Sequence, residues 1–191
     1  MREWIFVTSS RAKLAEAERI LGRRLVQHEL DLAEIQALDL ETVVAAKAQL
    51  AYDALGRVPI IVEDTGLSIE SWKGLPGALI RWFEDTVGSA GICSMMEGFA
   101  DRRARAQTIV AAHDGSLELF SGEVRGQIAL APRGDRGFGW DTIFIPDGEN
   151  RTFAEMTCEE KDRLSMRMKA FVDFAERERQ EAGRNDVFGE R

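Results

Sequence analysis

Two long runs of β-forming residues stand side by side in the middle of the chain, and they constrain the fold more than any other feature. The first is "RARAQTIVAAH", residues 103–113, and the second is "ELFSGEVRGQIAL", residues 118–130. The stretch "HDGS" that joins them has the composition of a tight turn. We therefore expect the two runs to pair as an antiparallel hairpin, so that the sheet of this protein contains antiparallel strands.

The N-terminal third alternates between strand and helix patterns. "WIFVT", residues 4–8, is an apolar run rich in β-formers, and apolar residues then recur at helical spacing up to Gly22. A second helix is predicted over residues 39–56, and "VPIIVE", residues 58–63, is predicted to be a second buried strand. This alternation indicates an α/β protein, and together with the hairpin it predicts a mixed sheet flanked by helices.

The rest of the chain is predicted to be mostly helical. "ALIRWFEDTVG" and "GICSMMEGF" are expected to form two short helices, and "TIFIP" a further strand. From Thr157 the pattern is helical, with a capping box at Thr157 and Glu160. Residues 177–191 are polar and predicted to be a frayed tail. The length suits a single domain with two lobes over residues 1–191. The apolar face of the last helix is predicted to comprise Leu164, Met168, Phe171, Val172 and Ala175.

The composition excludes several classes of function. The net charge of −8 argues against a nucleic-acid polymer as partner, because such proteins need a basic surface to displace counterions. No apolar run approaches the roughly 20 residues that span a bilayer, and the N-terminus lacks the apolar region of a signal peptide. We therefore expect a cytoplasmic protein without a membrane partner. Cys93 and Cys158 match no metal spacing and are expected to be free thiols.

The turn "TSSRAK", residues 8–13, lies between a predicted strand and a predicted helix. Backbone N–H groups at a helix N-terminus attract phosphate oxygens, and here Ser10 adds a hydroxyl and Lys13 a positive charge. The alternative is an ordinary helix cap beside a solvated lysine. The turn is not a P-loop, because the pattern GxxxxGK[ST] is missing.

Carboxylates follow the second strand, in "VEDTG". Glu63 and Asp64 are consecutive, so their side chains point to opposite faces, and a Thr-Gly turn is expected after them. Carboxylates at strand ends are a usual place to hold Mg²⁺. Glu34, in the polar loop "DLAEIQ", is a candidate for a second ligand. The alternatives are a solvated turn and a surface glutamate.

The stretch "RGFGWDTIF", residues 136–144, places two aromatic side chains and a carboxylate on a backbone loosened by glycines. A core strand would avoid those glycines, whereas a site that stacks a flat ring and reads its edge would use the whole set. Lys161 and Arg167 follow in the last helical region and would clamp a polyphosphate, or else lie on a solvated helix face. A ring-stacking surface, phosphate donors and carboxylates for Mg²⁺ are together what a nucleoside triphosphate requires.

Five ordered motifs make the chain resemble the inosine triphosphate pyrophosphatase family over nearly its whole length, from about residue 5 to about residue 174. They are "TSSRAK", "VEDTGL", "GLPGALIRWF", "GFGWDTIFIPDGENRTFAEM" and "EEKDRLSMR". The resemblance implies an elongated α/β protein with a cleft between two lobes, usually a homodimer. It also implies Mg²⁺-dependent cleavage of the α–β phosphate bond of ITP, dITP or XTP, giving the monophosphate and pyrophosphate.

The resemblance implies roles for individual residues. Asp64 and Glu34 would hold Mg²⁺ and orient the attacking water, and Asp64 would be the essential carboxylate. Phe138 would stack on the base beside Trp140, and Asp141 would bond the purine's edge. The substrate-binding set implied by the resemblance is Thr8, Ser10, Lys13, Phe138, Trp140, Asp141, Lys161, Ser165 and Arg167.

The chain departs from the family pattern at three positions. Ser10 stands where the family has Asn, Thr142 where it has Pro, and Met166 where it has a His that helps to read the base. Methionine cannot donate a hydrogen bond, so weaker discrimination among bases, or a different preferred nucleotide, is expected. Two alternatives stay open: a pyrophosphatase for other modified nucleotides, and a nucleotide-binding protein without turnover.

Overall fold

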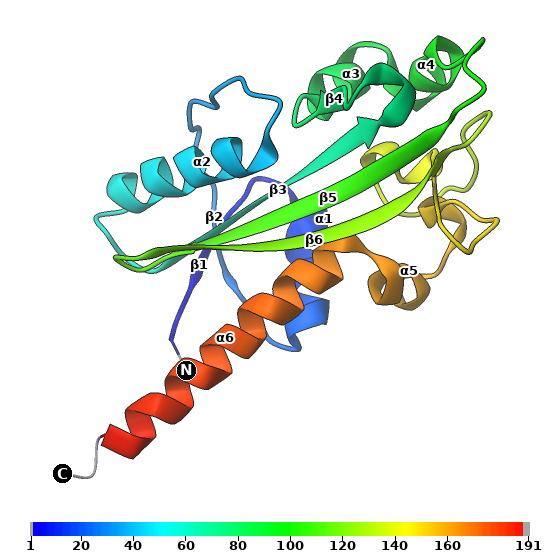
Figure 1. Cartoon of the computed structure of the whole chain (residues 1–191). Helices are drawn as coiled ribbons and strands as arrows, with labels where there is room; N and C mark the ends of the chain where they lie inside the picture. Colours follow the sequence, from blue (N-terminus) through cyan, green and yellow to red (C-terminus); the bar gives the residue numbers. More distant parts are fainter. Residues whose placement is uncertain (1, 189–191) are drawn as a thin grey trace.

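The computed structural model describes the backbone of residues 2–188 and the side chains of residues 2–183. These residues form one mixed, seven-stranded sheet flanked by helices, as the sequence predicts (Figure 1). The strand order is β2-β1-β3-β5-β6-β7, and the short β4 pairs with β3 beside this path. The sheet consists of β1 (Ile5–Val7), β2 (Val26–His28), β3 (Ile60–Ile69), β4 (Pro76–Gly77), β5 (Arg103–His113), β6 (Leu117–Ile128) and β7 (Phe144–Pro146).

Two of the helices are connected in sequence to the parallel strands of the sheet. α1 (Arg11–Leu21) follows β1, and α2 (Leu40–Ala54) precedes β3. Ser10 and Asp39 cap the two helices, each accepting a backbone N–H three residues later, and Gly22 ends α1 in the left-handed conformation. β1 runs parallel to both β2 and β3. Sequence reasoning missed β2 because it has only three residues and none of them is buried.

The predicted antiparallel hairpin is confirmed. β5 and β6 pair from Arg103 opposite Gln127 to His113 opposite Leu117, and β5 also pairs antiparallel with the full length of β3. β3 is longer than expected, because the Thr-Gly turn predicted after Asp64 is wrong. Thr65 lies inside the strand, where its hydroxyl is 2.9 Å from that of Thr108 on β5. This register places Glu63 and Asp64 in the middle of a long strand.

The C-terminal part contains a break that sequence reasoning placed inside one helix. α5 (Cys158–Leu164) is followed by Ser165, which belongs to neither helix and has an extended backbone. α6 (Met166–Phe188) begins at the next residue. The expected apolar face is therefore partly wrong, because the break changes which residues point at the sheet. Among the described side chains of α6, the buried residues are Met166, Arg167, Ala170, Phe171 and Phe174.

The expected frayed tail is also corrected in part, because α6 continues through Phe188. Glu178 accepts hydrogen bonds from Trp4 and Arg23, and Arg177 forms an ion pair with Glu118 on β6. Residues 177 and 178 are therefore bound both to the N-terminal part of the chain and to the sheet. Residues 189–191 of that expectation lie outside the described residues. None of the helices described is long and apolar enough to cross a membrane.

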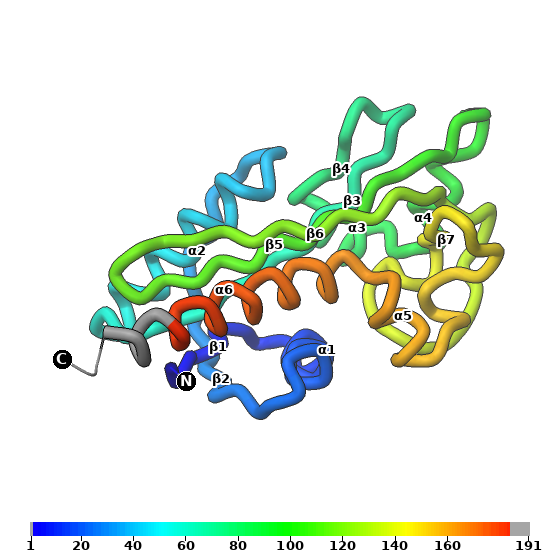
Figure 2. Tube along the Cα trace, turned by 60° about the horizontal axis from the view of Figure 1, so that its bottom comes forward, coloured from blue at the N-terminus to red at the C-terminus, as the bar shows by residue number. Residues whose placement is uncertain are grey.

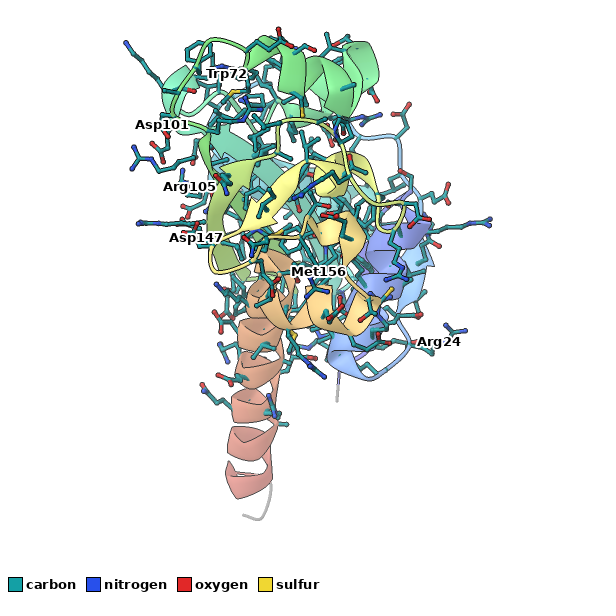
Figure 3. The ribbon with its side chains drawn as sticks, turned by 90° about the vertical axis from the view of Figure 1, so that its right-hand side faces the viewer. Arg24, Trp72, Asp101, Arg105, Asp147 and Met156 are labelled. Atoms are coloured by element: carbon teal, nitrogen blue, oxygen red, sulfur yellow. The ribbon has the colours of Figure 1, made fainter. Side chains whose placement is uncertain are left out.

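The hydrophobic core divides into three clusters among the described residues. One lies between the sheet and α2, and a second between the sheet and the helices α1 and α6 (Figure 2). The third lies at the opposite end of the long strands, where α3 (Ile80–Thr86), α4 (Gly88–Met95) and the segment carrying Trp140 and Phe144 pack together. Viewed from that end, Trp72 lies near α3 and α4, and Met156 lies beside α5 (Figure 3).

Gly122 of β6 sets the approach of α6 to the sheet. A Cβ atom at this position would lie 1.9 Å from the backbone oxygen of Met166 and 2.9 Å from the nitrogen of Ala170. We expect Gly122→Ala to lower the free energy of unfolding by about 1–3 kcal/mol, because backbone must move to admit the methyl group.

The control for this change is Gly183→Ala, since Gly183 lies in α6 with nothing within 4 Å of the added methyl group. This variant is expected to be neutral or more stable by up to about 1 kcal/mol, because alanine favours helix. Urea unfolding measures both variants. Equal stabilities would show that α6 does not depend on a bare backbone at Gly122.

Candidate active site

Two adjoining cavities lie between the two ends of the molecule and form one cleft. The larger, of about 660 Å³, is lined by the loop that contains Glu34 and by α2, β3 and the start of α1. The smaller, of about 190 Å³, is lined by Phe138, Trp140 and Asp141 together with residues of α3 and α6. Asp64 and Phe138 therefore open onto the same hollow. The residues lining both cavities are Ser10, Lys13, Asp64, Thr65, Ile80 and Arg81.

The position of Lys13 follows from unequal strand lengths. β1 pairs with only Ile60 and Ile61 of β3, and β4 pairs with Leu67 and Ser68 on the same edge, so the stretch of that edge between Ile61 and Leu67 has no strand beside it. The first turn of α1 carries Lys13, whose Nζ lies 2.8 Å from Glu63 Oε1 and 3.1 Å from Asp64 Oδ1. One ammonium group thus reaches both acids from the strand edge, although their side chains leave opposite faces.

The turn before α1 is closed by two side-chain oxygens that accept backbone N–H groups. Thr8 Oγ1 accepts the N–H of Ser10, and Ser10 Oγ accepts the N–H of Lys13. Each hydroxyl keeps its own O–H to donate to a ligand. Both residues line the larger cavity. The serine that replaces the family's asparagine therefore serves as the helix cap and still offers one donor.

Asp64 and Glu34 converge on one cation. Lys47 of α2 lies 2.6 Å from Glu34 Oε1 and 3.7 Å from Asp64 Oδ2, so its ammonium group stands between the two carboxylates. Burial opposes ionisation of Asp64, but Lys13 and Lys47 outweigh it and hold the pKa of that carboxyl below its ordinary value. Asp64 is therefore an anion at neutral pH, and it faces the larger cavity.

A chain of buried ion pairs connects the two cavities. Arg167 Nε donates to Glu63 Oε2 at 2.9 Å, and its Nη1 donates to Glu16. Lys161 Nζ donates to Glu16 at 2.7 Å and to Asp141 at 2.6 Å. Each of these five residues is nine-tenths or more buried, so each charge depends on its partners. With Lys13 at its end, the chain contains three cations and three carboxylates.

Ionisation states in the chain follow from this pairing. Burial would raise the pKa of Glu63 and of Glu16, but Arg167 and the lysines outweigh burial and lower both values. Burial likewise opposes the charge on Arg167, and the two glutamates reverse this and raise its pKa. Asp141 differs, because burial raises its pKa and Lys161 offsets this only in part.

The aromatic loop shows why glycine flanks Phe138. A Cβ at Gly137 would lie 2.2 Å from Asp141 Oδ2, and one at Gly139 would lie 2.6 Å from an oxygen of Glu84. Both glycines also have positive φ, so any other residue would be strained. The glycines therefore make room for two carboxylates, which the sequence did not indicate.

Within this loop the two aromatic rings have different surroundings. Phe138 is half-buried, and Lys161 Nζ and Arg167 Cζ lie 4.7 and 5.4 Å from its ring centroid. Trp140 is 6% exposed and packs edge-on against Phe144, so it forms a wall of the smaller cavity and belongs to the core. Asp141 accepts the N–H of Phe138 at 2.8 Å and fixes the loop.

Most residues singled out from the sequence meet at the cleft, and the exceptions are Lys161 and Ser165. Lys161 is buried in the ion-pair chain and lines neither cavity. Ser165 is the second exception. It is buried, accepts the N–H of Met168 as the cap of α6, and lines neither cavity. Sequence reasoning missed Lys47 and Glu84, which line the cleft, and Glu16, which is buried in the ion-pair chain. Glu16 had a signal, since it precedes Ala17 on the buried face of α1 and a lone acid there requires a partner.

The donor set suits a magnesium ion held jointly by protein and ligand. Among the side chains described, those of residues 2–183, there is no group of three or more His, Cys, Asp or Glu gathered as a complete metal site. Mg²⁺ usually takes one or two carboxylates and completes its shell with phosphate oxygens and water. Asp64 and Glu34 supply two hard oxygen ligands around a point that already attracts a cation.

The chain matches known proteins over most of its length. The family model described as the Ham1 family matches residues 4–177. A protein of Methanopyrus kandleri named dITP/XTP pyrophosphatase is 43% identical over 177 residues, covering 90% of this chain and 94% of its own. One of Kluyveromyces lactis named inosine triphosphate pyrophosphatase is 42% identical over 184 residues, covering 91% and 94%.

Solved structures agree with this match. A HAM1 protein from Coxiella burnetii superposes with a TM-score of 0.81 at 25% identity, covering 94% of this chain and all of its own. A dITP/XTP pyrophosphatase from Mycobacterium abscessus superposes with a TM-score of 0.72 at 26% identity, covering 90% and 98%. The resemblance to inosine triphosphate pyrophosphatases is confirmed, and the chain belongs to the Ham1 family.

Proposed function

We propose that this protein hydrolyses deaminated purine nucleoside triphosphates, such as ITP, dITP and XTP, to the monophosphate and pyrophosphate with Mg²⁺. The observation that carries the proposal is the shared cleft, in which the carboxylate of Asp64 and the ring of Phe138 line one continuous hollow. The combined volume lies within the range of about 300–1,000 Å³ typical of ligand sites. Relatives named as dITP/XTP or ITP pyrophosphatases support the same substrate class.

The two cavities divide the substrate between them. The phosphate tail lies in the larger cavity, where Thr8 and Ser10 offer hydroxyl donors and Lys13 a positive charge. The base lies in the smaller cavity against Phe138, and Arg167 and Lys161 approach the same ring. Stacking contributes on the order of 1–3 kcal/mol for any base, so selectivity depends on polar groups at the base's edge.

Asp64 is proposed as the essential carboxylate. With Glu34 it would hold Mg²⁺, which when bound neutralises the triphosphate and favours attack by water. The ionised Asp64 orients a water molecule whose oxygen attacks the α-phosphorus, and the bond to the bridging oxygen breaks as pyrophosphate leaves. Lys13 stabilises the negative charge that moves onto the leaving group. The described residues suggest no protein nucleophile for this step.

A panel of ITP, XTP, GTP, ATP and dUTP, assayed for pyrophosphate with and without Mg²⁺, tests the proposal. We expect release from ITP and XTP that depends on Mg²⁺ and exceeds release from ATP. Preferred release from a modified pyrimidine nucleotide would support the alternative pyrophosphatase. Tight binding of ITP without release would support a nucleotide-binding protein without turnover.

Assembly and location are part of the proposal. The resemblance supports a homodimer that works in the cytoplasm on free nucleotides. The mass of the particle in solution, measured by light scattering, distinguishes a dimer from a single chain of 21.3 kDa.

A further inference from the structure

Glu84 of α3 stands at the smaller cavity and has no role in the reaction described above. It is half-buried and lines the cavity beside the aromatic loop. Its Oε1 atom fills the space that a side chain at Gly139 would occupy, 2.6 Å from where a Cβ would stand. Among the described residues this buried oxygen has no hydrogen-bond partner. A carboxyl group thus lies at a small cavity, and one of its oxygens, packed against Gly139, is left without a hydrogen bond from any described residue.

The cavity is too small for a whole nucleotide and suits a base. Its volume of about 190 Å³ lies below the range of about 300–1,000 Å³ for complete ligand sites. Its polar lining consists of Ser10, Lys13, Asp64, Thr65, Arg81, Glu84, Asp141 and Arg167. Met166, which lines the same cavity, can neither donate nor accept strongly. Asp141 is already bound by Lys161 and the N–H of Phe138, and Asp64 by Lys13 and the N–H of Thr65. Glu84 is therefore the carboxyl group of this lining that keeps an oxygen without a hydrogen-bond partner among the described residues.

We propose that Glu84 selects the base by accepting the N1–H hydrogen bond of a 6-oxo purine, beside a cation that binds the neighbouring carbonyl oxygen. This rests on the proposed function and specifies its substrate class. Hypoxanthine, xanthine and guanine all present an N1–H donor next to the O6 acceptor. Adenine presents the reverse, an N1 acceptor next to an amino donor. A carboxylate facing adenine N1 meets a lone pair, so it opposes binding.

The charge on Glu84 decides how strictly adenine is rejected. An ionised carboxylate only accepts hydrogen bonds, whereas a protonated carboxyl also donates one and can pair with adenine N1. Burial, with the negative charges of Asp141 on the aromatic loop and Asp85 on the same helix, raises the pKa of Glu84 to about 7. Lys13 of α1 and the backbone N–H of Trp140 oppose this shift. The guanidinium groups of Arg81 and Arg167 line the same cavity.

The sign of the pH effect follows from this. Below its pKa, Glu84 is protonated and can bond to either base. It then accepts a hydrogen bond from the N1–H of a 6-oxo purine or donates one to N1 of adenine. As the pH rises through the pKa, Glu84 ionises, keeps its bond to the N1–H of a 6-oxo purine and loses its bond to adenine. Discrimination between ITP and ATP should therefore increase with pH. The ratio of the two kcat/KM values isolates this effect, because groups that act on the phosphates affect both substrates equally.

The experiment measures that ratio between about pH 5.5 and about pH 8.5, on either side of the Glu84 pKa. We expect the preference of the wild-type protein for ITP to rise by about tenfold or more over this range. Glu84→Gln keeps one donor and one acceptor at every pH, so its ratio should stay low and flat. Glu84→Leu removes the group and should also give a flat ratio. Glu97→Gln, an exposed change of the same charge near α4, should follow the wild type.

Two outcomes overturn the inference: a wild-type ratio that does not change with pH, or a Glu84→Gln ratio that changes as the wild-type ratio does. Failure of the proposed function looks different, since the wild-type protein would then release no pyrophosphate from ITP at any pH. In that case equilibrium binding of IMP and AMP over the same pH range gives the same ratio without turnover. Thermal unfolding of each variant shows that the comparison is made on folded protein.

Discussion

Asp64→Asn is expected to lower kcat for ITP by at least about 100-fold, the scale seen when one preorganised electrostatic group is removed from an active site. The substitution removes the negative charge that faces Lys13 and Lys47, and with it one of the two carboxylates proposed for Mg²⁺. The amide oxygen can still accept the N–H of Thr65, so the strand should keep its conformation. Pyrophosphate release at saturating ITP measures the loss.

The control and a second readout make this prediction specific. Asp173→Asn makes the same chemical change on an exposed position of α6 and should leave kcat unchanged. The Mg²⁺ concentration needed for half-maximal rate should rise in Asp64→Asn and stay the same in Asp173→Asn, because only the first alters the proposed ligand set. Wild-type turnover by Asp64→Asn would remove Asp64 from the mechanism.

Arg167→Met is expected to destabilise the folded protein by about 3–5 kcal/mol, because it leaves two buried carboxylates without their main partner. Arg167 is 1% exposed and binds Glu63, Glu16 and the hydroxyl of Thr65. A loss of this size is a large share of the stability of a typical domain. Urea unfolding at pH 7 measures it, and Arg179→Met, on an exposed turn of the same helix, is the control.

The pH dependence identifies the mechanism of the loss. In the wild-type protein the pKa values of Glu63 and Glu16 lie below the ordinary 4.5, so their contribution to stability is present above pH 4.5 and falls as the pH is lowered further. In Arg167→Met the same carboxyl groups are buried with less compensation and bind protons more readily. The difference between wild type and variant should therefore shrink as the pH falls from 7 toward 4.5.

A double substitution separates lost packing from unpaired charge. The double variant Glu63→Gln/Arg167→Met removes one negative and one positive charge. It should therefore recover part of the stability that Arg167→Met loses. The coupling energy from the double-mutant cycle is expected to be about 1–3 kcal/mol. Strictly additive losses, with no pH dependence, would contradict the account of Arg167 as the partner of buried carboxylates.

The sequence predicted those parts of the fold that depend on local pattern. The hairpin of β5 and β6, the helices α1 and α2 and the strand that carries Glu63 all have regular spacing and clear ends. The length of β3 was not predictable in the same way, because Thr65 and Gly66 favour a turn unless a neighbouring strand pairs with them. The break at Ser165 was missed because a capping serine between two helical patterns leaves the composition almost unchanged.

For the site, sequence reasoning found many of the residues that line the cleft and missed others that line it or lie buried beneath it. Asp64, Lys13 and Phe138 stand out beside turns and glycines. Glu16 and Glu84 lie within helices, where an acidic residue is common and its burial depends on what packs against it. The sequence also could not show why a glycine is required after Phe138, because Glu84, which fills the space beside Gly139, lies more than fifty residues earlier in the chain.

The connected ion pairs between Lys13 and Asp141 have a consequence for how such a protein can change its substrate. Each member neutralises the next, so replacing any one disturbs both the phosphate end and the base end of the cleft together. Glu84 and Met166 line the smaller cavity and form no ion pair with this network. Under the proposed function, nucleotide preference could change by substitutions at these two positions without disturbing the buried ion pairs.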